Sequence, residues 1–209
     1  MYKSENFQIS LWLVSLMSII LLMIIVGGLT RLTESGLSMV DWRLFMGTIP
    51  PLSHGDWLKV FEDYKQYPEY QIKNINMTLS EFKYIFWWEY GHRVLGRLIG
   101  IIFIIPFIYF ALKKYFSNEE LYSYSFLLFL GGAQGIIGWW MVKSGLDVNP
   151  YVSHLRLAVH LIIAQIILSL IAYLFLKRLD IGIYKNNFSS HKTCLLYTSD
   201  AADEEDSVD

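Results

Sequence analysis

Two histidines, each at the start of a long apolar stretch, have the clearest capacity for chemistry in this sequence. His92 precedes the apolar run 98–112, and His160 lies near the start of the run 152–176. If these helices begin near residues 84 and 152, both histidines lie roughly 12 Å from the helix start, at ~1.5 Å per residue. Two inward histidines at one depth are typical of bis-histidine haem iron. The pair therefore predicts a haem site between two helices.

Charged residues surround the first of these histidines. Glu89, His92, Arg93 and Arg97 are three or four residues apart, so a helix places them on one side. Ionisable groups this close to hydrocarbon are costly and usually mark function. The alternative is an interfacial helix start, whose arginines reach lipid headgroups. Arg93, Arg97 and, in the other helix, Arg156 are suited to neutralise carboxylates such as haem propionates. Zinc would require further ligands, for which Glu89 is the nearby candidate.

The remaining polar residues of the apolar stretches are interpreted as structural. His54 and His154 are expected at loop or helix boundaries, and His191 lies in the tail, so none of them is a predicted ligand. Gln134 is interpreted as an interhelical hydrogen-bond donor or acceptor. The glycines between 131 and 138 indicate a small-residue face that permits close helix contact. A buried, hydrogen-bonded core residue is the alternative interpretation of each histidine in the pair.

The composition is that of a membrane protein. Hydrophobic residues make up 54% of the 209 residues, aromatic residues 16% and charged residues 17%, and the mean hydropathy is +0.37. Cys194 is the single cysteine, so the chain offers no disulfide and no thiolate metal site. No basic cluster resembles a nucleic-acid surface. The acidic segment 180–209 lacks an apolar pattern; we expect it to be disordered and leave open whether it is native sequence.

Four apolar stretches predict four transmembrane helices, each near the ~20 residues that a bilayer crossing needs. They span about 7–29, 84–112, 121–142 and 152–176 within a haem-binding bundle of residues 1–179, with an outer loop over 30–83. The expected fold is an all-α, polytopic four-helix bundle. Basic pairs at 113–114 and 177–178 predict that both termini are cytoplasmic.

Two local features refine this expectation. Pro106 should kink or loosen the second membrane helix, because it cannot donate a backbone hydrogen bond. Residues 56–64 predict a short amphipathic helix within the outer loop, with Trp57, Val60, Phe61 and Tyr64 on its apolar face. Such a face suits a membrane surface or a lid over a site.

Four motifs in order resemble haem A synthases, in the alphaproteobacterial and mitochondrial branch that lacks a cysteine pair in the outer loop. They are GGLTRLTESGLS at 27–38, EYGHR at 89–93, QG followed by GWWMVKSGL within 134–146, and RLAVHL at 156–161. The resemblance covers residues 11–176. It implies one half of an eight-helix, pseudo-twofold protein that oxidises the position-8 methyl group of haem O to a formyl group, giving haem A for cytochrome oxidase.

The resemblance also implies roles for individual residues. His92 and His160 would hold the substrate haem O, and Glu89 would be the catalytic acid. The second half, with its haem b, is absent from this chain, which leaves open whether the fragment is active alone. A bacterial inner-membrane location, a homo-oligomer, and contacts with lipid, haem O synthase and cytochrome oxidase assembly factors are further implied.

Two functions from other classes compete with this one. A bis-histidine cytochrome b electron carrier would use the same iron ligands without catalysis, but it has no need of a buried acid at Glu89. A structural or assembly subunit would use the histidines only for packing, and it would show no haem absorbance.

Overall fold

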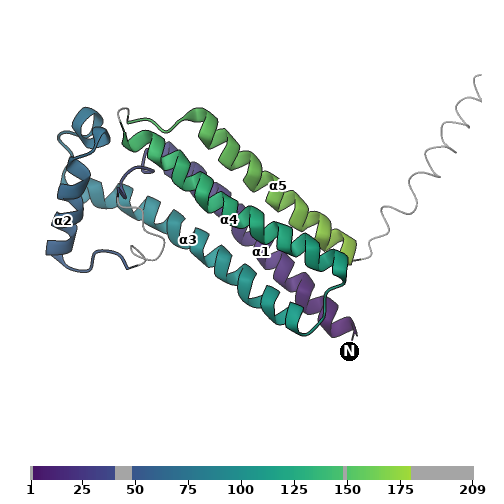
Figure 1. Ribbon diagram of the computed structural model, residues 1–209. Coiled ribbons are helices and arrows are strands. Elements are labelled where there is room, and N and C mark those ends of the chain that lie inside the picture. Colours follow the sequence, from purple (N-terminus) through teal and green to yellow (C-terminus); the bar gives the residue numbers. More distant parts are fainter. Residues whose placement is uncertain (1, 41–48, 148–149, 180–209) are drawn as a thin grey trace, which may run out of the picture.

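Four long helices make up most of the chain (Figure 1). The computed structural model describes residues 2–40, 49–147 and 150–179. The long helices are α1 (Tyr2–Leu32), α3 (Leu79–Leu112), α4 (Asn118–Leu146) and α5 (His154–Arg178), with α2 (His54–Lys65) and the π-helix η1 (Glu69–Lys73) between α1 and α3. All four are long and apolar enough to cross a membrane, and the described ranges contain no strand. The predicted all-α polytopic bundle is confirmed.

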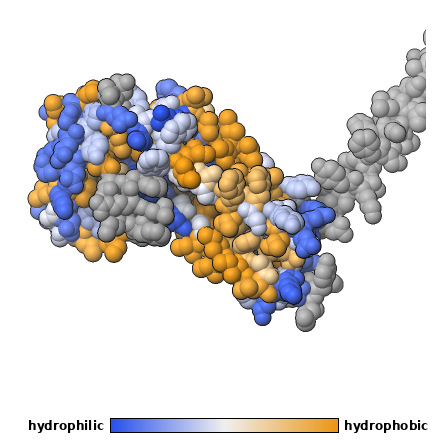
Figure 2. All heavy atoms as spheres, in the orientation of Figure 1, coloured by the Kyte–Doolittle hydropathy of each residue, from blue (hydrophilic) through white to orange (hydrophobic). Residues whose placement is uncertain are grey.

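Helices α3 and α5 occupy opposite corners of the bundle. Helix α1 packs against both α3 and α5, while α4 packs against α5 and, over a smaller area, against α3. Figure 1 shows α2 and the connection into α5 at one end, and the start of α1 with the α3–α4 turn at the other. We call residues 49–78, which contain α2 and η1, the cap. Figure 2 shows a broad apolar surface along the helices beyond it.

Capping boxes fix where α3 and α4 begin. The Thr78 hydroxyl accepts from the backbone N–H of Glu81, whose carboxylate in turn accepts from the Thr78 backbone. Ser117 and Glu120 make the same pair at the start of α4. Because these side chains satisfy the first free N–H groups, the helices extend beyond their apolar runs. Helix α3 thus begins five residues earlier than residue 84, the start expected from hydropathy.

The fully buried core of the bundle lies in the half away from the cap. Its core cluster draws on all four helices, with members such as Leu13, Phe103, Tyr124 and Ile171. By contrast, no residue is buried within 21–29 of α1, 90–102 of α3, 128–144 of α4 or 154–166 of α5. We call this level the open layer. The two candidate histidine ligands belong to it.

Pro106 lies inside a continuous α3, and a side chain from α1 compensates for the hydrogen bond that it removes. A proline at position 106 leaves the carbonyl of Ile102 without its usual helical donor. The indole Nε1 of Trp12 donates to that oxygen at 2.9 Å. Trp12 is itself buried against Phe103 and Phe110. A hydrogen bond between α1 and α3 therefore replaces the helical bond that Pro106 removes.

We expect Trp12→Phe to destabilise the bundle by roughly 1–3 kcal/mol, because it leaves a buried carbonyl unsatisfied while keeping an aromatic ring. Pro106→Ala supplies the control, since it restores the N–H that the Ile102 carbonyl lacks. In the Pro106→Ala protein, Trp12→Phe should therefore lower the free energy of unfolding by less than it does in the wild type. Thermal unfolding of the four proteins in detergent measures the coupling, and equal costs in both backgrounds would contradict this account.

The apolar face of α2 packs on α3. Trp57 stacks edge-on against Phe86 with ring centroids 5.0 Å apart, and the rings of Phe61 and Tyr64 each lie 5.0 Å from that of Phe82. The amphipathic helix predicted for residues 56–64 is confirmed. Its suggested contact with a membrane surface is wrong, because its apolar face is buried within the protein.

The glycines of α4 differ in what they contact. An added Cβ would meet nothing within 4 Å at Gly131, Gly132 or Gly135, so close helix packing at these positions is not observed among the described residues. At Gly145 it would lie 2.7 Å from Cδ1 of Leu37. Leu37, in the Ser-Gly-Leu sequence at 35–37 after α1, thus packs on Gly145, in the Ser-Gly-Leu sequence at 144–146 that ends α4.

Candidate functional site

His92 and His160 both lie in the open layer. They project from the diagonally placed α3 and α5, and their imidazoles are close enough for their charges to interact. The Nδ1 atoms of both rings are buried, and within the described ranges neither has a hydrogen-bond partner. A buried polar atom without a partner is costly in a protein interior. At Nδ1, the described residues therefore give no support to the interpretation of these histidines as hydrogen-bonded core residues.

A glycine from a neighbouring helix packs against each imidazole. A Cβ added at Gly27 of α1 would lie 3.0 Å from Cε1 of His92. One added at Gly138 of α4 would lie 3.3 Å from Cε1 of His160. The backbone of α5 is also held at this level, because Nε2 of Gln134 donates to the His160 carbonyl at 3.0 Å. The interhelical hydrogen bond predicted for Gln134 is confirmed.

Glu89 lies one turn before His92, and its carboxylate is buried with partners on both oxygens. Oε2 accepts from the Ser38 hydroxyl at 2.8 Å and from the Met39 backbone N–H at 2.7 Å. Oε1 accepts from Nη2 of Arg93 at 2.5 Å, in an ion pair between adjacent turns of α3. Glu89 is only 3% exposed. A buried carboxylate with a paired cation and hydrogen bonds to both oxygens is electrostatically well compensated.

The three arginines predicted to bind carboxylates have different surroundings. Nη2 of Arg93 also donates to the Met39 carbonyl at 2.8 Å, so Glu89 and Arg93 together hold both polar groups of that residue. Arg97 is half-buried one turn further along α3. Arg156 stacks over the Trp140 ring, with its guanidinium carbon 4.5 Å from the ring centroid, and Nη1 donates to the Trp140 carbonyl.

The other histidines are remote from this arrangement or outside the described ranges. His54 and His154 are the first residues of α2 and α5, and both are exposed. His191 and the rest of segment 180–209 lie outside the residues that the structure describes. Among those it does describe, no three His, Cys, Asp or Glu side chains come together as metal ligands. Glu89 is bound to Ser38, Met39 and Arg93, so it does not complete a zinc site with the histidines.

A second buried acid, in the cap, carries no sequence signal and was not predicted. Glu69 is 3% exposed, and its Oε2 accepts from the hydroxyl of the fully buried Tyr64 at 3.0 Å. Nδ2 of Asn74 donates to the same hydroxyl at 2.8 Å. Burial raises the pKa of Glu69 to about 7. A lone glutamate in a polar loop sequence gives no pattern from which this burial could be read.

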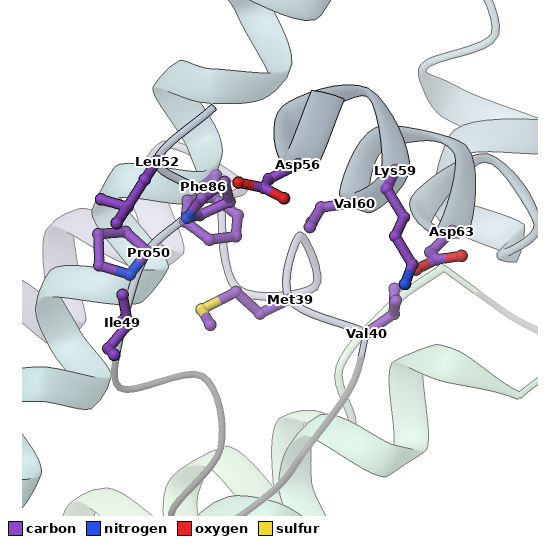
Figure 3. Close-up of a pocket in the computed structure, with 11 residues that line it drawn as sticks. Met39, Val40, Ile49, Pro50, Leu52, Asp56, Lys59, Val60, Asp63 and Phe86 are labelled. Atoms are coloured by element: carbon purple, nitrogen blue, oxygen red, sulfur yellow. The ribbon is translucent and has the colours of Figure 1, made fainter. Parts of the chain in front are cut away.

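A hollow of about 420 Å³ lies between the cap and the segment that Glu89 holds (Figure 3). Its walls include Met39 and Phe86, with Asp56, Lys59 and Asp63 of α2 along one side. The histidines do not line it. Its connection to the site is through Met39, whose backbone is bonded to Glu89 and Arg93.

The sequence matches one protein family over most of its length. The family model COX15-CtaA, described as a cytochrome oxidase assembly protein, matches residues 10–197. The chain belongs to this family. The match contains both histidines, Glu89 and the three arginines. It agrees with the resemblance on which the sequence-based expectation was built.

Curated proteins that are similar to this chain carry the name "Heme A synthase". The protein of Bradyrhizobium diazoefficiens is 51% identical over 156 residues, which are 75% of this chain and 43% of the relative. That of Flavobacterium psychrophilum is 51% identical over 78% of this chain and 48% of its own length. That of Nitrosospira multiformis is 48% identical over 83% and 49%. The chain thus spans about half the length of these relatives, and no solved structure matches it.

Proposed function

We propose that this chain is the amino-terminal half of a haem A synthase, which oxidises the position-8 methyl group of haem O to a formyl group. The observation that supports the proposal is the pair His92 and His160, which lie on different helices of the open layer, close enough for their charges to interact, with Nδ1 atoms that have no hydrogen-bond partner among the described residues. Relatives of about 50% identity that bear this enzyme's name support the reaction.

The residues at this level fit a flat, iron-containing substrate. Neutral imidazoles from two facing helices are suitable axial ligands for haem iron. Gly27 and Gly138 bring the neighbouring backbones close to the two rings, and larger side chains there would push on them. An imidazole that ligates iron generally donates its other ring N–H to a carbonyl, carboxylate or water. If Nε2 of each ring bound the iron, Nδ1 would be the nitrogen that needs such a partner, and the described residues supply none.

Haem O would be oriented by the arginines of the open layer. Its propionates are carboxylates, for which guanidinium groups are the preferred partners. Arg97 and Arg156 are the candidates on the two opposed helices, together with Arg93. Arg93 also binds Glu89, so its contribution to the substrate is linked to the position of the acid.

Glu89 would handle protons or stabilise positive charge beside the reacting methyl group. It lies one turn from His92, and its two oxygens are fixed by Ser38, Met39 and Arg93. A group held this firmly has little reorganisation to make when charge develops nearby. An electron carrier of the cytochrome b type would not need such an acid.

We further propose a bacterial inner-membrane location with the cap outside and both termini in the cytoplasm. Lys113 and Lys114 follow α3, and Lys177 and Arg178 end α5, all at the end away from the cap. Basic residues favour the cytoplasmic side. Haem O synthase, which supplies the substrate, would act in the same membrane.

The test is haem A formation by residues 1–179 joined to the second half of the Bradyrhizobium relative. The fusion is produced in a bacterium that makes haem O and lacks a haem A synthase of its own. Extracted haems are identified by mass, with the hydroxymethyl intermediate recorded separately. We expect haem A from the fusion, and we expect the chain alone to hold haem O. A fusion that inserts in the membrane but neither binds nor converts haem O would refute the proposal.

A further inference from the structure

The short segment that binds Glu89 follows α1 and is itself held from outside. Residues 35–39 come directly after Glu34, whose φ of 51° turns the chain at the end of α1. Four of these five residues are buried. Within the segment, the Ser38 hydroxyl and the Met39 N–H both donate to the Glu89 carboxylate. The position of that carboxylate therefore depends on what fixes segment 35–39.

Leu37 is the residue through which this segment contacts α4. A Cβ built on Gly145 would lie 2.7 Å from Cδ1, 2.9 Å from Cδ2 and 3.4 Å from Cγ of Leu37. The end of the leucine side chain thus occupies the place where any other residue at position 145 would carry its Cβ. Leu37 is only 3% exposed, and Gly145 is buried as well. The contact is therefore part of the packed interior, where even one methyl group matters.

The end of α4 that receives Leu37 is also bonded to the start of α5. The Ser144 hydroxyl, next to Gly145 in the chain, accepts from the backbone N–H of Ser153 at 3.0 Å. Ser153 is the residue before α5, the helix that carries His160. A continuous series of contacts therefore joins the start of α5 to the segment that binds Glu89.

We propose that Leu37 and Gly145 are positioning residues for the Glu89 carboxylate. The inference rests on the proposed function, because it assigns the two residues to the site of haem O oxidation. Neither residue touches the substrate, and both act through Ser38 and Met39. Glycine is needed at position 145 so that Leu37 can pack directly on the backbone of α4, and leucine is needed at position 37 to fill that space.

Gly145→Ala should displace segment 35–39 and slow the reaction. The added methyl group would overlap Cδ1 of Leu37, which must then move against its packed neighbours. Because a misplacement of about 1 Å can lower a rate by ~10²-fold, we expect kcat for haem O to fall by roughly 10–100-fold. KM and the haem spectrum should not change, because the predicted iron ligands keep their places. The two-half fusion is the protein measured.

Leu37→Ala tests whether the two residues act through their mutual contact. This substitution removes Cγ, Cδ1 and Cδ2, the three atoms that an added Cβ would meet. In the Leu37→Ala protein, Gly145→Ala should therefore reduce kcat by a much smaller factor than in the wild type. Gly132→Ala is the matched control, because it adds the same methyl group to the same helix where no atom lies within 4 Å. It should leave kcat unchanged.

Hydrogen exchange measures the segment itself, without haem and without turnover. The Met39 amide donates to Glu89, so its exchange rate reports how firmly the segment is held. In the full chain without haem, this amide should exchange at least about tenfold faster in Gly145→Ala than in the wild type. Gly145→Ala should have little further effect on exchange in the Leu37→Ala protein.

Each outcome supports or overturns the proposal. Faster exchange at Met39 and a lower kcat, with an unchanged haem spectrum and with both effects reduced in the Leu37→Ala protein, support it. Wild-type exchange in Gly145→Ala overturns it, and so does an equal loss of kcat with and without Leu37. Loss of the haem spectrum along with kcat also overturns it, because the contact would then support the whole bundle.

Two further cases keep the test decisive. If Gly145→Ala does not fold, Leu37→Ala decides: it should speed exchange at Met39 and lower kcat, and wild-type values of both overturn the proposal. A wild-type fusion that makes no haem A, while the exchange results hold, rejects the proposed function and not the contact. The two failures are therefore distinguishable.

Discussion

The His92→Ala and His160→Ala variants should each lose the low-spin, bis-histidine haem spectrum that the proposed iron ligation predicts. Alanine removes an axial ligand and leaves nothing else to reach the iron, since no other described histidine lies near the pair. Haem affinity should fall by more than the roughly 10–100-fold that loss of a supporting contact to a metal ligand costs. Absorbance spectra and haem content of the purified proteins measure both effects.

The exposed histidines provide the controls for this experiment. His54→Ala and His154→Ala change the first residues of α2 and α5 and should leave the spectrum unchanged. Gly138→Val should shift the spectrum without abolishing it, because it presses on the His160 ring from α4. A wild-type spectrum in either His92→Ala or His160→Ala would remove the ligand assignment.

The second large effect concerns Glu89. Glu89→Gln should retain bound haem while turnover of haem O falls by ~10²-fold or more, the usual consequence of losing a positioned acid or base. The amide cannot reproduce every contact, because all the described partners of the carboxylate are donors and one oxygen becomes an NH₂ group. Haem A formation by the two-half fusion is the measurement.

Ser38→Ala separates proton chemistry from loop anchoring. It removes the hydroxyl bond to Glu89 and keeps both the charge and the pair with Arg93. If Glu89 serves only to anchor the segment at Met39, Ser38→Ala and Glu89→Gln should reduce turnover by similar factors, because each weakens that anchor. Unchanged turnover in Glu89→Gln would return the function to the electron carrier, and loss of haem would make Glu89 a structural residue.

The sequence predicted the membrane helices because these depend on local composition and helical spacing. The histidine pair stays a prediction that rests on the same spacing. Hydropathy alone placed the start of α3 five residues late, because the capping box at Thr78 is polar. The amphipathic pattern also predicted α2 correctly. Such a pattern identifies the apolar face of a helix, but not the segment on which that face packs. The partner is the start of α3, which carries Phe82 and Phe86.

Contacts between distant segments could not be predicted. Ser38 and Met39 bind an acid about fifty residues further along the chain, and nothing in the motif at 35–38 indicates that bond. Nothing in the apolar run that contains Trp12 indicates that its indole donates to the Ile102 carbonyl freed by Pro106. Glu69 was missed for the same reason, since its burial depends on how the cap folds back on α3.

The open layer has a consequence for the life of the protein in the cell. None of the side chains at this level is fully buried, so a ligand seated between the helices would add its binding free energy where the chain packs least closely on itself. At a free ligand concentration of about 100 times Kd, this linkage amounts to about 2.7 kcal/mol. Membrane proteases would therefore degrade chains that have bound haem more slowly than chains without it. The amount of this protein would follow the supply of its ligand without any dedicated regulator.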